Sequence, residues 1–456
     1  MNRIAGRAGI TLLLVLILIA GLGFFAAEFI TEADGWVVFP GSPHVYNGNN
    51  IDCGVVTDRD GMLLADLRNG RVYADAADLR MSTVHWLGDR YGSISAPALS
   101  NYAAQIAGFD LVNGVYRYGN TGGMVSLTLS AQVQQAALEA LGDRKGTVSV
   151  YNYKTGELLC AVTTPTYDPD NVPDIEGDTT GVYDGIYVNR FTQSTYTPGS
   201  IFKIVTLAAA LETVEEIQQQ RFVCTGSYAL GSDQITCEST HGEQDLKTAF
   251  RNSCNCAFAQ IALQVGGEAL EQYTKQFAVT DRIAFDGITT AAGNFEAADA
   301  AQINVAWSGV GQYNDQINPC AFLTFIGAIA GDGKGTVPYL VDRIKVGKET
   351  TYSAEIVKQD RIMSVSTAQV LQEYLRSNVE QRYGDEYFPG LQVCAKTGTA
   401  EVGGGQKPHA MLAGYVMDEA YPLAFMVCVE NAGYGGTVCL PVASRVLAAC
   451  KLVLDS

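Results

Sequence analysis

The feature that most constrains this chain is an uncharged apolar stretch near its N-terminus, which runs from Gly9 to Ala27. As a helix rising about 1.5 Å per residue, it would span roughly 28 Å, close to the hydrocarbon thickness of a bilayer. Arg3 and Arg7 precede it, so the positive-inside rule predicts a cytoplasmic tail at 1–8. A cleaved signal peptide is the alternative, but its apolar region is usually shorter and no A-x-A cleavage site follows here. We therefore expect a single-pass anchor at 9–27 and an extracytoplasmic remainder.

The part of the chain beyond the anchor is acidic. Without the two N-terminal arginines it has 28 basic against 48 acidic residues, which gives a net charge near −20. Such a surface does not neutralise phosphates, so we expect no nucleic-acid partner. The apolar fraction of 47% and the charged fraction of 17% are typical of a folded globular protein.

Eleven cysteines and four histidines are scattered along the chain. Cys224 and Cys237 bracket a loop and are candidates for a disulfide; free, buried thiols are the alternative. Cys254, Cys256 and His241 lie close in sequence, but a structural zinc site needs four ligands in a compact pattern. The histidines at 44, 85, 241 and 409 form no metal-binding pattern, and no G-x-S-x-G elbow supports a Ser-His-Asp triad. We therefore expect no metal ion and no cofactor.

Two regions follow the anchor. Residues 28–124 contain short apolar runs and many turn residues, and we expect a small pedestal domain there. From 125 onward the pattern is clearer: 146–153 and 158–164 read as two strands, and Ser130 is placed to cap a helix over 131–142. The first of two Lys-Thr-Gly tripeptides, 154–156, joins the two strands. Gly156 would supply positive φ, so this copy is predicted to be a hairpin turn.

A predicted helix over 197–212 carries a single charge. Lys203 is the only charged residue between Arg190 and Glu212, on a helix that is apolar nearly all round. Burial would lower the pKa of this ammonium, and a neutral lysine can act as a general base. Ser200, three residues earlier, shares its helix face and lies near free backbone N–H groups suited to an oxyanion. Taken alone, S-x-x-K is more often a capping serine beside a solvent-reaching lysine, so further motifs are needed.

Two further motifs complete a set. Ser253-Cys254-Asn255 and Lys396-Thr397-Gly398 follow Ser200-x-x-Lys203 in the order S-x-x-K, S-x-N, K-T-G. With the blocks YTPGSIFK, HGEQDLKTAFRNSCNCAFAQIA and AKTGTAE, the chain resembles class B penicillin-binding proteins over roughly residues 125–450. The resemblance implies an α+β, serine β-lactamase/transpeptidase-like fold in 125–456. Its five-stranded antiparallel sheet is flanked by helices, with an all-helical subdomain beside it.

The resemblance also implies an activity, that of a peptidoglycan D,D-transpeptidase which is acylated by β-lactams. Ser200 would attack the penultimate D-alanine of a D-Ala-D-Ala stem peptide, and Lys203 would take the serine proton. Lys396 would help to keep Lys203 neutral and would attract the terminal carboxylate. The catalytic set carried over is Ser200, Lys203, Ser253, Asn255 and Lys396; the substrate-binding set is Thr397, Gly398 and Thr399.

The remaining roles follow from the same resemblance. Ser253 and Asn255 would relay protons and hold the substrate amide, and Thr397 and Thr399 would hydrogen-bond the carboxylate. The N–H groups of Ser200 and Thr399 would form the oxyanion hole. A class B protein would also work beside a membrane-embedded glycan polymerase of the elongation or division machinery.

The sequence leaves other functions open. A D,D-carboxypeptidase or β-lactamase would pass the acyl group to water, although Asn255 departs from the class D β-lactamase pattern. A β-lactam-sensing receptor domain would need a signalling module, which an eight-residue tail does not supply. No glycosyltransferase domain is evident between the anchor and residue 125, so a bifunctional class A protein is not expected.

Overall fold

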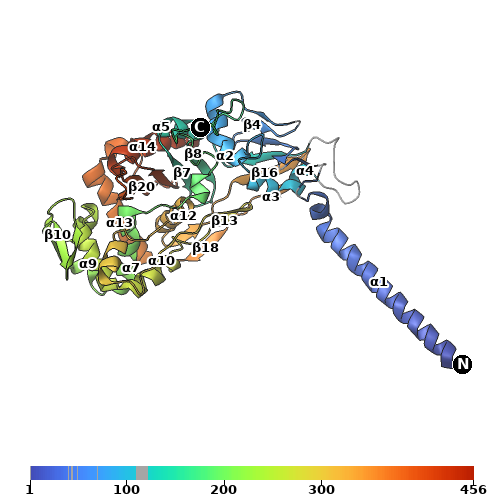
Figure 1. Cartoon of the computed structure of the whole chain (residues 1–456), viewed down its shortest axis with the longest axis horizontal. Coiled ribbons are helices and arrows are strands. Elements are labelled where there is room, and N and C mark those ends of the chain that lie inside the picture. The colour runs from blue at the N-terminus through green and yellow to red at the C-terminus, as the bar shows by residue number, and fades with distance from the viewer. Residues whose placement is uncertain (1, 40, 43–44, 49, 69, 109–121) are drawn as a thin grey trace.

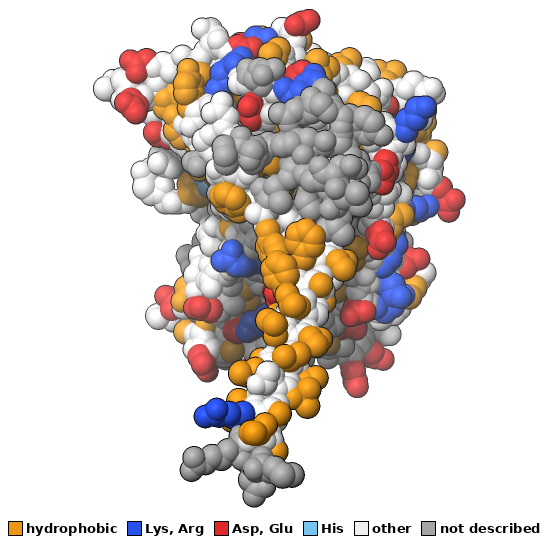
Figure 2. Space-filling view, turned by 90° about the vertical axis from the view of Figure 1, so that its right-hand side faces the viewer, with side chains coloured by type: hydrophobic (Ala, Val, Ile, Leu, Met, Phe, Trp, Pro, Cys, Tyr) orange, Lys and Arg blue, Asp and Glu red, His pale blue; other side chains and the backbone are white. Residues whose placement is uncertain are grey.

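The computed structural model describes every residue except 1, 40, 43–44, 49, 69 and 109–121. His44 and the predicted pedestal segment 109–121 therefore lie outside the described residues. Helix α1 (Asn2–Val37) leaves the body of the molecule and carries the N-terminus at its far end (Figure 1). Its segment Ile4–Ala33 is long and apolar enough to cross a membrane, and its most apolar window is not buried. Figure 2 shows apolar side chains along this helix and a basic side chain toward its N-terminal end.

The predicted five-stranded antiparallel sheet is confirmed. Its strand order is β19-β20-β21-β7-β8, and every neighbouring pair is antiparallel. The strands are β19 (Val393–Ala400), β20 (His409–Val416), β21 (Leu423–Val429), β7 (Gly146–Asn152) and β8 (Leu158–Thr164). The strand that carries the second Lys-Thr-Gly therefore forms one edge of the sheet, and the hairpin of the first copy forms the other.

Helices cover both faces of this sheet, which explains why its strands are apolar on both sides. On one face, α5 (Ala131–Leu141) and α14 (Gly435–Leu454) pack against alternate residues such as Val148, Val150 and Leu412. On the other face lies α12 (Pro319–Ala330). Ser130 caps α5 as predicted, because its hydroxyl accepts a hydrogen bond from the Val133 N–H at 3.5 Å. Helix α14 is also long and apolar enough to span a membrane, but much of it is buried against the sheet.

A helical subdomain lies beside the sheet (Figure 1). Its helices are α7 (Lys203–Thr213), α8 (Leu246–Arg251), α9 (Asn255–Val265), α10 (Gly267–Gln276), α11 (Gln302–Ser308) and α13 (Val365–Asn378). The expectation that this subdomain is all-helical needs correction, because residues 221–245 form two short antiparallel ribbons. One pairs β9 (Arg221–Cys224) with β12 (Gly242–Asp245), and the other pairs β10 (Ser227–Leu230) with β11 (Asp233–Thr236). Both are half-exposed, so their sequence shows no clear apolar alternation.

The sheet of the N-terminal region combines strands from distant parts of the chain. Its order is β17-β16-β6-β3-β4-β5. The hairpin of β3 (Val55–Thr57) and β4 (Leu63–Asp66) is followed by β5 (Val72–Tyr73), whereas β6 (Met124–Leu127), β16 (Val341–Val346) and β17 (Glu349–Ser353) come later. The predicted boundary at 124/125 therefore does not separate the two sheets. Residues 341–353 return to the N-terminal region through backbone pairing, which local sequence does not reveal.

Helix α2 (Ala77–Leu87) joins the N-terminal region to the five-stranded sheet. Trp86 donates its indole N–H to the Ala161 carbonyl of β8 at 2.7 Å, and Arg80 forms an ion pair with Asp168 at 2.6 Å. The remaining α-helices and strands of the described ranges are short: α3 (Pro97–Asn101), α4 (Ala103–Ala107), α6 (Arg190–Gln193), β1 (Tyr46–Asn47), β2 (Asn50–Ile51), β13 (Ala284–Phe285), β14 (Ile288–Thr289), β15 (Lys334–Thr336) and β18 (Lys358–Arg361).

Candidate active site

Ser200 lies in a tight turn that approaches the sheet edge. The 3-10 turn Gly199–Ile201 leads directly into α7, which begins at Lys203. Gly199 has φ +53°, and a Cβ at this position would stand 2.3 Å from the Thr399 carbonyl oxygen. Only glycine permits both the positive φ and this close approach of the turn to β19. The local backbone thus places the Ser200 hydroxyl against the strand that carries Lys396 and Thr399.

Lys203 is completely buried beneath Ser200. Its Nζ lies 2.9 Å from the Ser200 Oγ, 2.7 Å from the Asn255 Oδ1 and 2.7 Å from the Ser253 carbonyl oxygen. Burial is the largest cause that lowers the pKa of this lysine, to about 8. Near neutral pH about one molecule in ten therefore carries the neutral amine, whose lone pair can accept the hydroxyl proton.

Ser253 and Asn255 connect Lys203 to the neighbouring segments. Ser253 has φ +55°, a left-handed conformation that costs a non-glycine residue about 1 kcal/mol. Its hydroxyl oxygen lies 3.2 Å from the Lys203 Nζ and 3.0 Å from the Lys396 Nζ. Asn255 begins α9 and donates its side-chain N–H to the Thr236 carbonyl at 2.9 Å, which orients its Oδ1 toward Lys203. One hydroxyl thus lies between two ammonium groups.

Lys396 is the second fully buried lysine of the site. Its Nζ donates to the Ser253 Oγ and, at 2.9 Å, to the Thr397 carbonyl oxygen. Burial, followed by repulsion from Lys203 and Arg382, lowers its pKa well below the usual lysine value. Repulsion from Lys203 thus helps to lower the pKa of Lys396, whereas the pKa of Lys203 is lowered first by burial and then by repulsion from Arg382. The expected help of Lys396 in keeping Lys203 neutral stays a prediction. Two adjacent buried ammonium groups disfavour full protonation of the pair.

The remaining residues of the second Lys-Thr-Gly motif form one wall of a cleft. Thr397 donates its backbone N–H to the Tyr383 hydroxyl at 3.1 Å, and its own hydroxyl lies 3.0 Å from the same oxygen. A Cβ on Gly398 would stand 2.9 Å from an Ile201 methyl carbon, so this glycine lets β19 pack against the Ser200 turn. Thr399 lines the cleft beside Ser200. The structure therefore brings all eight predicted site residues together.

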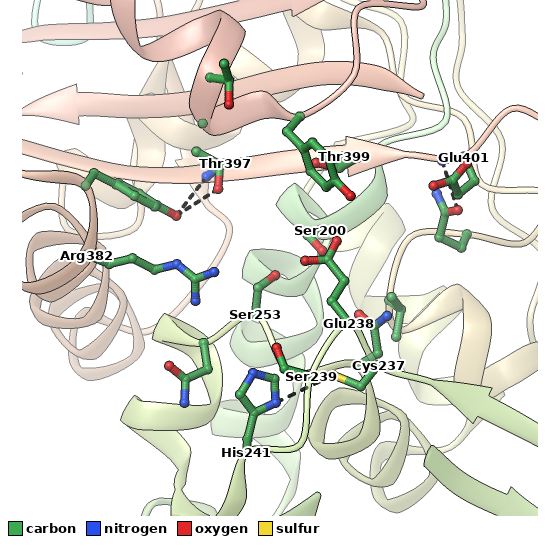
Figure 3. Close-up of a pocket in the computed structure, with 18 of the residues that line it drawn as sticks. Ser200, Cys237, Glu238, Ser239, His241, Ser253, Arg382, Thr397, Thr399 and Glu401 are labelled. Atoms are coloured by element: carbon green, nitrogen blue, oxygen red, sulfur yellow. Dashed lines mark hydrogen bonds between the residues drawn. The ribbon is translucent and has the colours of Figure 1, made fainter. Parts of the chain in front are cut away.

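The cleft has a volume of about 820 Å³ and is charged on opposite sides. Figure 3 shows Arg382 on one side of Ser253 and Glu238 on the other, with Glu401 near Thr399. Sequence reasoning missed Tyr383 and Arg382, which a π-helical turn at Val379–Tyr383 directs toward the cleft. It also did not place Glu238 and His241 in the cleft, because both lie between β11 and β12 in a segment without a regular apolar pattern. No residue spacing indicated that these side chains would face Ser200.

The first Lys-Thr-Gly copy is a turn, as predicted. Gly156 has φ +93°, and the Asn152 side chain accepts the N–H groups of Lys154 and Thr155 at 2.9 and 3.1 Å. Lys154 is exposed, and its tripeptide is absent from the residues that line the cleft. The two copies differ in environment: one lysine is solvated at a hairpin tip, and the other is buried beside Ser253.

We expect Lys154→Ala to leave β-lactam acylation unchanged within about twofold, since a solvated surface side chain contributes little to a distant site. The measurement is the second-order rate constant for labelling of the full-length protein by a fluorescent penicillin. Lys396→Ala is the matched variant and should lower that constant by at least about a hundredfold, a typical loss for a group that assists proton transfer. A large loss with Lys154→Ala would mean that the wrong copy had been assigned to the site.

Comparisons with known proteins agree with this geometry. The penicillin-binding protein transpeptidase domain model matches residues 146–448. The chain is 28% identical over 363 residues to the peptidoglycan D,D-transpeptidase PbpA of Mycobacterium tuberculosis, with 72% of each chain covered. It is 27% identical to the stage V sporulation protein D of Bacillus subtilis, covering 71% of this chain and 52% of that protein.

Solved structures give the same result. The imipenem acyl-enzyme complex of penicillin-binding protein A from M. tuberculosis superposes with a TM-score of 0.74 at 26% identity, covering 88% of this chain and 98% of that one. The D,D-transpeptidase domain of a peptidoglycan glycosyltransferase from Eggerthella lenta gives 0.75 at 26% identity, with the same two coverages. The matched family model spans more than half of the chain and includes Ser200, Ser253 and Lys396. The chain therefore belongs to the penicillin-binding protein transpeptidase domain family.

Proposed function

We propose that this protein is a class B peptidoglycan D,D-transpeptidase that crosslinks stem peptides through an acyl-enzyme on Ser200. The observation that carries the proposal is the hydrogen-bonded chain Ser200–Lys203–Ser253–Lys396, which joins a nucleophile to two buried lysines at the floor of a cleft. A serine whose hydroxyl contacts a lysine of lowered pKa is an activated nucleophile. Two relatives support the same reaction class: PbpA, named a peptidoglycan D,D-transpeptidase, and penicillin-binding protein A, whose structure is an imipenem acyl-enzyme complex.

Acylation follows from these contacts. The neutral Lys203 amine accepts the Ser200 proton while Oγ attacks the carbonyl carbon of the penultimate D-alanine. The peptide C–N bond then breaks, and Ser253 passes a proton to the departing nitrogen, so that terminal D-alanine leaves with its amine intact. With a β-lactam the same bond breaks within the ring, and the nitrogen remains tethered to the acyl-enzyme. N–H groups of Ser200 and Thr399 would stabilise the negative oxygen.

Deacylation reverses the roles of these groups. An amine from a second stem peptide attacks the ester carbonyl and loses a proton to the same base, which frees the Ser200 hydroxyl and forms the crosslink. Lys396, Thr397 and Thr399 would bind the donor's terminal carboxylate before acylation. Arg382 adds a positive charge on this side of the cleft.

The direct test is product analysis with the full-length protein in detergent. We expect a D-Ala-D-Ala stem pentapeptide and an acceptor peptide with a free side-chain amine to yield the crosslinked peptide and one D-alanine per bond, as measured by mass spectrometry. Release of D-alanine with only the hydrolysed tetrapeptide would identify a carboxypeptidase instead. Turnover of a β-lactam would identify a β-lactamase, and a single stable acylation without any peptide product would favour a receptor domain.

The rate of acylation should rise with pH. Only the neutral Lys203 amine accepts the Ser200 proton, and the pKa of this group is lowered to about 8. The second-order acylation constant should therefore increase about tenfold per pH unit below 8 and level off above it. Measurement from pH 6 to 9, with circular dichroism as the control for folding, checks this. A profile that is flat or falls over this range would contradict Lys203 as the base.

The same proposal includes a location and a partner. Helix α1 would be a single-pass anchor with residues 1–8 in the cytoplasm, and the domains at 28–124 and 125–456 would lie outside it. The apolar surface of α1 and the Arg7 charge near its N-terminus support this orientation. A membrane-embedded glycan polymerase would supply the strands to be crosslinked. Protease protection of a tag on the N-terminus in intact cells tests the topology, and co-purification of a polymerase with the anchored protein tests the partner.

A further inference from the structure

Four side chains of types that can bind a metal ion meet beside the S-x-N motif. Cys224 ends β9, Cys237 follows β11, His241 precedes β12, and Cys254 precedes α9. One ligand atom from each residue lies within 4.8 Å of all the others. All eleven cysteines belong to the described ranges, and none of them forms a disulfide bond, so the alternative of a Cys224–Cys237 bridge is not what the structure contains.

The distances within this cluster fit a tetrahedral ion. The Cys237 Sγ lies 4.0 Å from the Cys254 Sγ and 3.6 Å from the His241 Nδ1. Around Zn²⁺, with Zn–S near 2.3 Å and Zn–N near 2.0–2.1 Å, the edges of a regular tetrahedron are about 3.8 Å for two sulfurs and about 3.6 Å for sulfur and nitrogen. A disulfide would need about 2.05 Å between the sulfurs. The spacing therefore matches ligands around one ion better than two bonded sulfurs.

The strands around the four residues are short, and a bound ion would stabilise them. Both ribbons of 221–245 are only four residue pairs long, too short to be stable by themselves. Cys224 and Cys254 are buried and Cys237 and His241 are half-buried, which leaves one side open for an ion to enter. Cys237 and His241 both line the active-site cleft (Figure 3). A bound ion would join β9, the segment between β11 and β12, and the start of α9 through their side chains, in addition to the backbone pairing of β9 with β12.

We propose that Cys224, Cys237, His241 and Cys254 bind one Zn²⁺ in a structural site that positions the S-x-N motif. Three thiolates and one imidazole are a Cys₃His donor set, which selects zinc over the harder divalent cations. Binding transfers the thiol protons to solvent and involves no redox change. This replaces the expectation, drawn from sequence, that the protein holds no metal.

Cys254 connects the proposed zinc site to the catalytic groups. Cys254 stands between Ser253 and Asn255, both of which contact Lys203. Ser253 must keep a left-handed backbone conformation, and Asn255 is held by the Thr236 carbonyl, one residue before Cys237. An ion that joins Cys237 to Cys254 would therefore fix both ends of this arrangement. Cys254 is a positioning residue in this account, and it does not contact the substrate.

Metal content is the first test, because it does not depend on activity. Full-length protein, purified without chelators from zinc-supplemented cells, should contain about one zinc per chain, as measured by inductively coupled plasma mass spectrometry. His241→Ala and Cys254→Ser should lose most of this zinc, whereas Cys256→Ser, two residues further along at the start of α9, should keep it. Cobalt substitution of the wild-type protein should give the intense visible absorption bands of a tetrahedral thiolate site. This measurement needs no variant, so it tests the site even if a variant does not fold. Zinc below about 0.2 per chain, together with a disulfide among these cysteines in the peptide map, would overturn the site.

The positioning effect is tested separately and rests on the proposed acylation at Ser200. Removal of zinc with a membrane-permeant chelator should lower the second-order acylation constant at least about tenfold, and one equivalent of zinc should restore it. The Cys256→Ser protein is the matched control and should show the same loss and recovery. Full acylation by protein that has been shown to lack zinc would overturn the positioning role. Failure of the proposed function would appear differently, as zinc-loaded protein that is never acylated.

Discussion

Ser200→Ala should abolish covalent labelling of the full-length protein by a fluorescent penicillin. The substitution removes the oxygen that would form the ester and that lies 2.9 Å from the Lys203 Nζ. We expect the acylation constant to fall by at least about 10³-fold, as is usual when the nucleophile of such a unit is deleted. The measurement is labelling detected in a gel, with mass spectrometry to locate the adduct.

The controls separate chemistry from folding. Ser366→Ala changes an exposed serine on α13 and should label like the wild type. The melting temperature of the Ser200→Ala protein should stay close to the wild-type value, because Ser200 is only partly buried and loses one hydrogen bond. A Ser200→Ala protein that still carries a covalent adduct would show that another residue is the nucleophile.

Lys203→Arg should be nearly as damaging as loss of the serine, although it retains a positive charge. A guanidinium is not deprotonated in proteins, so arginine cannot accept the Ser200 proton. The larger planar group must also fit where Lys203 is completely enclosed and contacts Ser253 and Asn255. We expect the acylation constant to drop by about 10²–10⁴-fold, the range for removal of a general base.

A matched lysine and a fold measurement complete this experiment. Lys275→Arg alters an exposed lysine that pairs with Glu271, and acylation should not change. Circular dichroism shows whether the Lys203→Arg protein is folded, and labelling is then expressed per folded molecule. Acylation within tenfold of the wild-type rate would rule out Lys203 as the required base.

Much of the fold could be predicted because its signals are local. The Ser130 cap, the 146–164 hairpin and the apolar strands around Lys396 each depend on residues that are neighbours in sequence. Pairings between distant segments were not predicted. Residues 341–353 complete the N-terminal sheet, and nothing in their own pattern indicates which strand they join. The 221–245 ribbons were missed because half-exposed strands lack a clear apolar period.

The candidate site shows the same division. The three motifs could be found from sequence because each is a short pattern with a chemical meaning. Lys203 is the only charged residue between Arg190 and Glu212, and Lys396 is the only one between Glu386 and Glu401. Tyr383 and Arg382 carried no such signal, since an irregular helical turn sets their direction. In the sequence, Cys254, Cys256 and His241 lie close together. The structure instead brings Cys224, Cys237, His241 and Cys254 within 4.8 Å of one another, without Cys256.

The sequence by itself determined which residues have the chemistry for this reaction: a serine and two lysines without charged neighbours in the sequence. It also determined that the second Lys-Thr-Gly lies in an apolar strand and the first in a turn. Only the tertiary structure decided that Ser200, Ser253 and Lys396, far apart in the chain, are linked through Lys203 by hydrogen bonds of at most 3.2 Å. The physical reason is that hydrogen bonds and metal coordination act over a few ångströms. Sequence patterns report the local backbone, whereas packing of the helices against the sheet sets which distant side chains come within that range.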